Sequence, residues 1–185
     1  MFTEEDGKVL LKLARDSIKS FFEGKDVHVK DDIIKKYSEK HGVFVTITID
    51  NTLRGCIGYP EPIYPLYEAV LNSARSAAFS DPRFKPLTKE EFKDIHVEVS
   101  VLTVPELIKA KPEDYVKNIN VGEDGLIIRS KYSSGLLLPQ VATEYNWDAK
   151  QFLEHTCEKA GLDKDSWKEK DILVYKFQGQ IFKEG

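Results

Sequence analysis

Residues 43–58 carry the clearest structural signal in the chain, a predicted β-hairpin. The run VFVTITI at residues 43–49 alternates with the two-residue period of a strand. The next three residues, DNT, favour a turn, and LRGCIG at residues 53–58 is typical of a returning strand. Strands joined by so short a turn run antiparallel. The fold is therefore expected to contain an antiparallel sheet.

The length of the turn decides which side chains share a face of this hairpin. A two-residue turn pairs Val45 with Cys56. A three-residue turn pairs Thr46 with Cys56 and Thr48 with Arg54. We favour the three-residue turn because it gathers the polar side chains on one face of the sheet.

Further helices and strands are interspersed along the rest of the chain. Helical spacing of apolar residues predicts helices, and two-residue alternation or apolar runs between turns predict strands. The predicted helices cover residues 3–22, 31–41, 64–79, a short stretch from 88, and 148–160; the predicted strands cover residues 96–101, 126–128, 136–138 and 173–182. Because hairpin-type turns separate several strands, the predicted class is α+β, with a largely antiparallel sheet flanked by helices.

Size and composition narrow the class of protein. A chain of 185 residues fits one domain, or one domain with a small appended lobe. A net charge of -4 counts against a general nucleic-acid binder, which carries a basic excess. No apolar run approaches the roughly 20 residues that span a bilayer. The acidic start MFTEED lacks the parts of a signal peptide, and two cysteines are too few for a disulfide framework, so the expected compartment is the cytoplasm.

The returning strand of the hairpin carries the leading candidate for a reactive side chain, the thiol of Cys56. In a regular strand, Arg54 and Cys56 point to the same face. A nearby cation favours the thiolate, which is the reactive form of cysteine. Gly55 and Gly58 lack a Cβ and permit close approach of another group. The alternative is a structural cysteine in a β-bulge, and the hexapeptide alone leaves both readings open; Cys157, on an apolar helix face, is expected in the core.

Glu98 is the candidate acid or base. In the predicted strand 96–101, His96 and Glu98 point to one face, and the valines point to the other. This polar face is either a solvated outer surface or one wall of a cleft opposite the thiol. Asp81 and Arg83 flank a proline, which predicts either a preshaped loop at a site or a local ion pair.

Motifs for metals and nucleotides are missing from the sequence. There is no C-x-x-C and no H-x-x-x-H, and the two cysteines lie about a hundred residues apart. There is also no P-loop and no G-x-G-x-x-G. The sequence therefore predicts neither a metal site nor a cofactor.

The run LRGCIG at residues 53–58 resembles the hallmark hexapeptide of the AMMECR family, named for the AMME-syndrome candidate region protein. Similar blocks follow in family order at residues 77–84, 98–102, 135–141, 144, 147–148, 152–153 and 157–162. Together these blocks extend across nearly the whole chain.

The resemblance implies a fold and a set of partners. It implies a larger α+β lobe and a smaller lobe, with the hexapeptide near the cleft between them. Related prokaryotic domains occur beside or fused to a Memo-like domain and a radical SAM domain, which implies a part in modifying a protein or a small molecule. Many relatives carry His-Gly where this chain has Asp124-Gly125, so any role of that histidine does not transfer.

The first functional hypothesis is an enzyme or enzyme component with a polar cleft. Its predicted lining is Arg54, Cys56, Asp81, Arg83, Glu98 and Gln140. Cys56 is then the nucleophile or attachment point, Arg54 stabilises the thiolate or an anionic substrate group, and Glu98 is the acid or base. The candidates for substrate binding are Gly55, Gly58, Asp81, Arg83 and Gln140.

Two other hypotheses belong to different functional classes. The second is a non-catalytic module that binds a protein partner, such as the radical SAM or Memo-like protein, with a cysteine that only packs. The third is a nucleotide or nucleic-acid binder in which Arg54 and Arg83 contact phosphate, and the acidic net charge counts against it.

Overall fold

The structure is a computed structural model that describes residues 2–185 and divides into two compact units. Among the described residues, unit 1 consists of residues 2–102 together with 180–185, and unit 2 consists of residues 103–179. Strand β7 (Leu173–Lys183) begins in unit 2 and ends in unit 1.

The helices of unit 1 are α1 (Glu4–Glu23), α2 (Asp31–Lys36), α3 (Leu66–Phe79) and the 3₁₀ helix η1 (Glu91–Lys93). α1 begins with a capping box, in which Thr3 and Asp6 each accept the backbone N–H of the other. It ends at Gly24, which has the left-handed φ of 64° common after helices. α2 is shorter than predicted and ends at Lys36, because Lys40 already takes part in a β-bridge.

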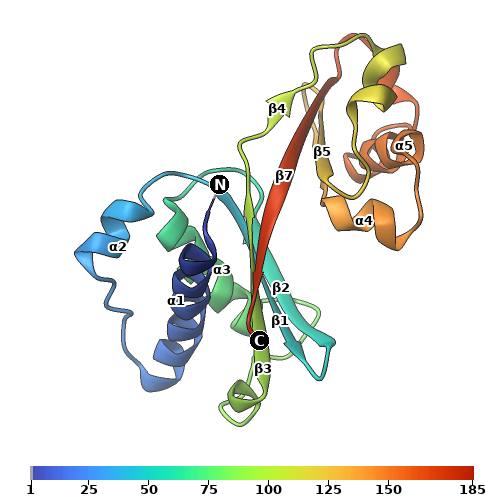
Figure 1. Ribbon diagram of the computed structural model, residues 1–185. Coiled ribbons are helices and arrows are strands. Elements are labelled where there is room, and N and C mark those ends of the chain that lie inside the picture. The colour runs from blue at the N-terminus through green and yellow to red at the C-terminus, as the bar shows by residue number, and fades with distance from the viewer. Residues whose placement is uncertain (1) are drawn as a thin grey trace. The chain divides into compact units, whose positions relative to one another are not determined.

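The sheet of unit 1 contains β1 (Gly42–Ile49), β2 (Thr52–Tyr59), β3 (Ile95–Leu102) and the end of β7, in the order β2-β1-β3-β7. β1 runs antiparallel to both of its neighbours. α3 packs on β1 and β2, and α1 packs on α3 and β3, so both helices cover the same face of the sheet (Figure 1). The core between them includes Leu10, Ala14, Ile18, Val43, Val45, Ile47, Ala69, Val70, Val97 and Val99. The residues that alternate with these valines and isoleucines therefore face away from the helices.

The hairpin turn between β1 and β2 has two residues and not the three that we expected. Ile49 pairs with Thr52, so that only Asp50 and Asn51 lie in the turn. Their φ values are 50° and 60°, which is the pair of left-handed residues of a type I′ turn. This turn suits the twist of antiparallel strands better than a longer one, and both Asp and Asn tolerate positive φ.

A β-bulge follows the turn in β2 and shifts the pairing of the strands on the turn side of the bulge. Thr48 pairs with Leu53, where we expected Arg54. Arg54 is instead the extra residue of the bulge. The bulge compensates for the shorter turn, so Thr46 lies opposite Cys56 as predicted. Regular alternation, from which we expected Arg54 and Cys56 to share a face, does not hold across the bulge.

Unit 2 consists of β4 (Glu106–Leu107), η2 (Pro112–Asn118), β5 (Asp124–Arg129), β6 (Ser134–Leu137), α4 (Pro139–Glu144), α5 (Ala149–Lys159), η3 (Ser166–Lys168) and the start of β7. β5 pairs antiparallel with β6 and β7, and β4 pairs with β7. Phe152, Leu153 and Cys157 of α5 are fully buried in the core of this unit. Asp148 and Gln151 form the predicted capping box at the start of α5.

The predicted class is confirmed: the fold is α+β, with an antiparallel sheet flanked by helices and a larger and a smaller unit. α4 is an element that the sequence did not predict, because its six residues are too few to show helical spacing. In the part of the chain that the structure describes, no helix is long and apolar enough to cross a membrane.

Candidate functional site

Cys56 lies on the sheet face of unit 1 that points away from α1 and α3. Its neighbour Gly55 lies against the Ala77 carbonyl of α3, so alternation directs Cys56 to the opposite face. Thr46 of β1 pairs with Cys56 on one side and with Glu98 of β3 on the other. The thiol, hydroxyl and carboxylate of these three residues form one row across three strands, which we call the polar row.

The sulfur of Cys56 contacts the middle residue of the polar row. Thr46 Oγ1 donates a hydrogen bond to Cys56 Sγ at 3.3 Å. Cys56 is half buried and is not part of a disulfide. A charged acceptor makes stronger hydrogen bonds than a neutral one, so this donor interacts better with a thiolate than with a thiol.

Asp81 and Arg83 hold the backbone of Cys56 from outside the sheet. The Cys56 N–H donates to Asp81 Oδ2 at 2.9 Å, and Arg83 Nη2 donates to the Cys56 carbonyl at 3.3 Å. β2 is the edge strand of unit 1, so without these partners both backbone groups would lack a bond in the sheet. Asp81 and Arg83, which we call the Cys56 clasp, take the place of a further strand.

The two residues of the Cys56 clasp also form an ion pair with each other. Arg83 Nε and Nη2 donate to the two Asp81 oxygens at 3.0 and 2.8 Å. The Asp81 side chain is 1% exposed, whereas that of Arg83 is 54% exposed. Hydrogen bonds from Arg83, then from the Cys56 and Arg83 backbone, hold the pKa of Asp81 well below its usual range despite burial. The expected local ion pair is present, and it is joined to the Cys56 backbone.

Arg54 belongs to a separate ion pair. Its Nε and Nη2 donate to the two oxygens of Glu91 at 2.9 and 3.0 Å, and its Nη1 donates to the Lys85 carbonyl at 3.0 Å. The guanidinium that reaches the Cys56 backbone is that of Arg83. Both guanidinium groups lie over the Phe84 ring, at 6.0 Å for Arg54 and 5.5 Å for Arg83. The segment after α3 is thus bound to β2 through the Arg54–Glu91 ion pair, the hydrogen bonds to the Cys56 backbone and the Phe84 ring.

Acid should weaken the Arg54–Glu91 pair in a defined pH window. Pairing with Arg54, together with the Thr88 N–H, lowers the pKa of Glu91 from an ordinary 4.5 to about 2. A carboxyl group whose pKa is lower in the folded state stabilises the protein at pH values above its unfolded-state pKa. This contribution is lost as the pH falls through its folded-state pKa. The side chain is about one-third exposed, so we expect a contribution of about 1 kcal/mol or less.

Urea denaturation at a series of pH values tests this window. Between about pH 4.5 and pH 2, the free energy of unfolding should fall more steeply in the unmodified protein than in Glu91→Gln. Glu90→Gln, at the exposed neighbouring carboxylate, is the matched control and should retain the steep slope. Equal slopes for the unmodified protein and Glu91→Gln would contradict the expectation.

At Gly55 and Gly58, backbone atoms of neighbouring elements lie so close to β2 that a side chain would not fit. A Cβ at Gly55 would lie 2.1 Å from the Ala77 carbonyl oxygen of α3, and a Cβ at Gly58 would lie 2.1 Å from the Val43 carbonyl oxygen of β1. Real Cβ atoms do not approach so closely, so the two glycines permit tight packing of β2 against its neighbours.

The polar row extends beyond the residues that the sequence indicated. Glu98 Oε2 pairs with Lys183 Nζ at 2.8 Å, and the Glu98 side chain is 23% exposed. His96 lies on the same face opposite Thr48 and is exposed. Sequence reasoning missed Lys183 as part of this row because it lies at the other end of the chain. Thr46 was placed correctly by the strand register but was not chosen as a site residue.

Gln140 lies in unit 2, as the second residue of α4, whereas the other candidate residues lie in unit 1. Asp124 is also in unit 2. It is 1% exposed and accepts hydrogen bonds from the Asn120 N–H at 2.9 Å and from Gln178 Nε2 at 3.1 Å. Lys176 Nζ lies 3.4 Å from it. Asp124 therefore ties the preceding loop to β7.

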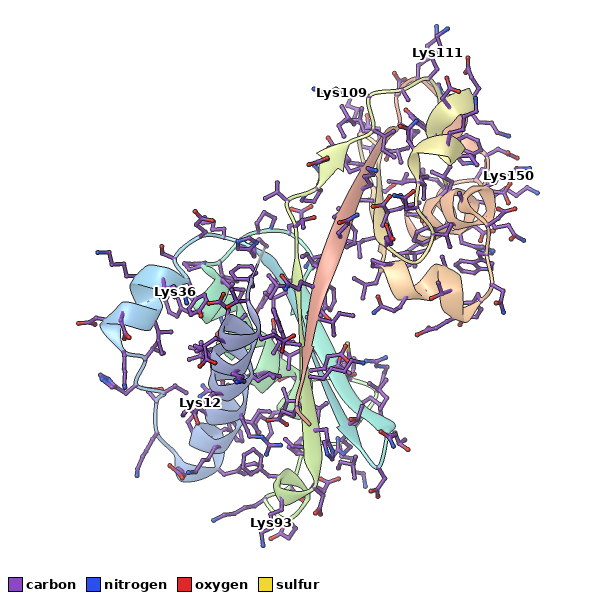
Figure 2. All side chains as sticks on the ribbon, in the orientation of Figure 1. Lys12, Lys36, Lys93, Lys109, Lys111 and Lys150 are labelled. Atoms are coloured by element: carbon purple, nitrogen blue, oxygen red, sulfur yellow. The ribbon has the colours of Figure 1, made fainter. Side chains whose placement is uncertain are left out.

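The structure also contains an open groove in unit 1, whose lining includes His96 and Lys183 but not Cys56, Thr46 or Glu98. It has a volume of about 1300 Å³ and lies between α1, the start of β3 and the end of β7. Lys12 and Lys93 line it (Figure 2), and Arg15, also in its lining, is paired with Glu184. The groove carries both signs of charge and does not include Cys56. Across residues 2–185, no group of three or more His, Cys, Asp or Glu side chains is placed to share a metal ion.

Comparison with known proteins gives close matches over the full chain. The family model AMMECR1 matches residues 11–182. A protein of Methanothermobacter thermautotrophicus is 49% identical over 184 residues, which cover 98% of this chain and 96% of that protein. Protein PF1979 of Pyrococcus furiosus is 49% identical over 187 residues, covering 98% and 89%. The crystal structure of the uncharacterized protein PH0010 from Pyrococcus horikoshii superposes with a TM-score of 0.89 at 48% identity and covers 99% of this chain and 93% of that one.

Proposed function

Because the chain belongs to the AMMECR1 family, we propose that the polar row of unit 1 is its functional site and that Cys56 is a reactive thiol there. In this proposal the protein is an enzyme, or a component of one, that transfers a group to or from a protein or a small molecule through the Cys56 sulfur. One observation carries the proposal: both backbone polar groups of Cys56 are held by side chains, while the residue remains only half buried.

The Cys56 clasp supports a chemical role because it fixes the position of the sulfur. A nucleophile is effective when its supporting groups hold it in one geometry before the substrate binds. Asp81 and Arg83 restrain the backbone of Cys56, and Thr46 Oγ1 restrains its sulfur. A cysteine that served only to fill space would not need the hydrogen bond that Thr46 donates to its sulfur.

The proposed step is nucleophilic attack by sulfur. Cys56 first loses its proton to water, because Glu98 lies two strands away with Thr46 between them. The thiolate then forms a bond to an electrophilic carbon of the substrate, and the leaving group departs with the electron pair of the bond that breaks. Glu98 keeps the acid or base role, with Lys183 compensating its charge. Arg83 replaces Arg54 as the guanidinium that contacts Cys56, which it does at the backbone carbonyl, because Arg54 is occupied by Glu91.

Alkylation kinetics test whether the thiol is reactive. In a Cys157→Ala variant at neutral pH, we expect iodoacetamide to modify Cys56 about threefold or more faster than it modifies N-acetylcysteine. The reason is that hydrogen bonds to its backbone and its sulfur hold Cys56 in one geometry at a half-exposed position. Mass spectrometry of the intact protein against time gives the rate.

The variant Cys56→Ser is the matched control, because it leaves only Cys157. Burial in unit 2 raises the pKa of the Cys157 thiol to about 11, so this variant should remain unmodified while folded. If Cys56 reacts more slowly than N-acetylcysteine in the folded protein, the thiol is structural and the reactive-thiol proposal fails.

A second candidate function is a non-catalytic protein-binding module, with a radical SAM or Memo-like protein as the expected partner. The observation that favours it is that residues of the family-like blocks 53–58 and 77–84 bind each other: Asp81 and Arg83 bind the Cys56 backbone. Arg54 and Glu91 likewise bind the loop after α3 to the sheet. If Cys56 is alkylated more slowly than N-acetylcysteine, the protein-binding module becomes the favoured function.

Phosphate recognition by Arg54 and Arg83 receives no support from the geometry. Each guanidinium already donates two hydrogen bonds to one carboxylate, Glu91 for Arg54 and Asp81 for Arg83. A phosphate would have to displace a bidentate ion pair. For the compartment we propose the cytoplasm, where the two free thiols of this chain persist in reduced form.

A further inference from the structure

Unit 2 carries a stack of three aromatic rings at the corner between α4 and α5. The centroids of Tyr145 and Trp147 lie 4.9 Å apart, and those of Trp147 and His155 lie 3.8 Å apart, each pair with 16° between the ring planes. Tyr145 is nevertheless 65% exposed. An aromatic ring that is stacked on one face and open to solvent on the rest of its surface is a typical binding surface.

The stack is held rigidly without a ligand. Asn146, between the two aromatic residues, has a left-handed φ of 53°, and the Trp147 N–H donates to the Ala142 carbonyl at 2.8 Å. His155 is fixed at the other end, because its Nδ1 lies 2.7 Å from Glu158 Oε2. Binding to such a surface requires little ordering of the rings, which favours affinity.

The surroundings of the stack are acidic. The charged side chains from Glu144 to the end of α5, apart from His155, are Glu144, Asp148, Lys150, Glu154, Glu158 and Lys159. Lys150 projects from α5 (Figure 2), and its Nζ is 3.7 Å from Glu154. Four carboxylates against two lysines favour a cationic ligand over a phosphate.

We propose that this aromatic stack binds an arginine side chain of a partner protein, with the guanidinium on the exposed face of Tyr145. Guanidinium is planar and stacks on parallel rings, and it remains charged at any physiological pH. A cage for an ammonium group needs walls that enclose it, whereas the rings here are nearly parallel. This inference concerns unit 2 and does not depend on the reactivity of Cys56.

A titration with short blocked peptides tests the proposal on the full chain. The probes are acetyl-Gly-Arg-Gly-amide, its lysine counterpart and its citrulline counterpart, and the signals are the ring resonances of Tyr145 and Trp147 in NMR. We expect the arginine peptide to bind more tightly than the lysine peptide, because a planar guanidinium stacks on parallel rings and an ammonium group does not. The citrulline peptide, which is planar but neutral, should bind more weakly than the arginine peptide.

Tyr145→Leu should reduce binding of the arginine peptide about fivefold or more. The matched control is Tyr132→Leu, because Tyr132 is also in unit 2 and is 87% exposed but lies outside the stack. This control should bind the arginine peptide as the unmodified protein does. Equal binding of the three peptides, an equal loss in Tyr132→Leu, or stronger shifts with adenosine monophosphate than with the arginine peptide would each overturn the proposal.

Discussion

Replacing Gly55 by alanine should destabilise unit 1 by about 3 kcal/mol, near the upper end of the range for overpacking. The added Cβ would lie 2.1 Å from the Ala77 carbonyl oxygen and 3.0 Å from the Ala77 carbonyl carbon. Both atoms belong to the backbone of α3, so no side-chain rotation relieves the clash. Either β2 or the last turn of α3 must move, and Cys56 would move with β2. The urea midpoint for unfolding measures the loss.

The control for Gly55→Ala is Gly185→Ala, where a Cβ would meet no atom within 4 Å. This variant should unfold at the same urea concentration as the unmodified protein. A loss of about 3 kcal/mol is a large part of the 5–15 kcal/mol that stabilises a typical domain, so Gly55→Ala should also lower the yield of folded protein. An unchanged midpoint for Gly55→Ala would show that β2 does not need to lie so close to α3.

The hairpin shows how much of the fold could be predicted from the sequence. Alternation along residues 43–49 identified β1 and its apolar face correctly. The pairing of Thr46 with Cys56 was also correct, but the turn length was wrong. A two-residue turn with a bulge and a three-residue turn without one give the same pairing beyond Arg54. Local sequence does not distinguish them, because the energy of a bulge depends on the contacts of its extra residue.

Those contacts explain why the partner of Cys56 was misjudged. Arg54 lies two positions from Cys56 in sequence, so regular alternation made it the expected cation beside the thiol. In the structure, Arg54 leaves that pattern at the bulge and is paired with Glu91, 37 positions along the chain. Arg83 reaches the Cys56 backbone from the loop after α3. Pairings over such separations follow from the packed fold and cannot be read from spacing.

Strand alternation was more informative for Glu98. The same period that buries the valines of β3 places Glu98 on the opposite face, in line with Thr46. Its partner Lys183 could not be predicted, because the last strand was identified without its neighbours. The sequence thus predicted two positions of the polar row by local geometry and missed the ion pair that ends it.

Removing the carboxylate of Asp81 should also lower the free energy of unfolding strongly, because this group accepts hydrogen bonds from both Cys56 and Arg83. In Asp81→Ala, the Cys56 N–H loses its acceptor and Arg83 loses its counter-ion. Breaking a buried pair costs about 3–5 kcal/mol, and since the Arg83 guanidinium is 54% exposed and regains water, we expect the lower end of this range. The free energy of unfolding in urea at neutral pH measures the effect.

The loss in Asp81→Ala should shrink in acid. The pKa of Asp81 is lowered in the folded protein. Its contribution to the free energy of unfolding is therefore full at pH values above the unfolded-state pKa of about 3.9, and it decreases as the pH falls toward the folded-state pKa. Asp114→Ala removes an exposed carboxylate that pairs with Lys117 in the same helical turn, and it should cost less than about 0.5 kcal/mol.

Alkylation of Cys56 in the Asp81→Ala variant tests whether Asp81 stabilises only the edge of β2 or the whole protein. If the Cys56 clasp holds the edge of β2 in place, its loss lets this edge open, so Cys56 becomes more accessible while Cys157 in unit 2 stays protected. If both cysteines become modified together, Asp81 supports the whole fold and the clasp has no special relation to the thiol. If Asp81→Ala is as stable as Asp114→Ala, the edge of β2 holds without the clasp.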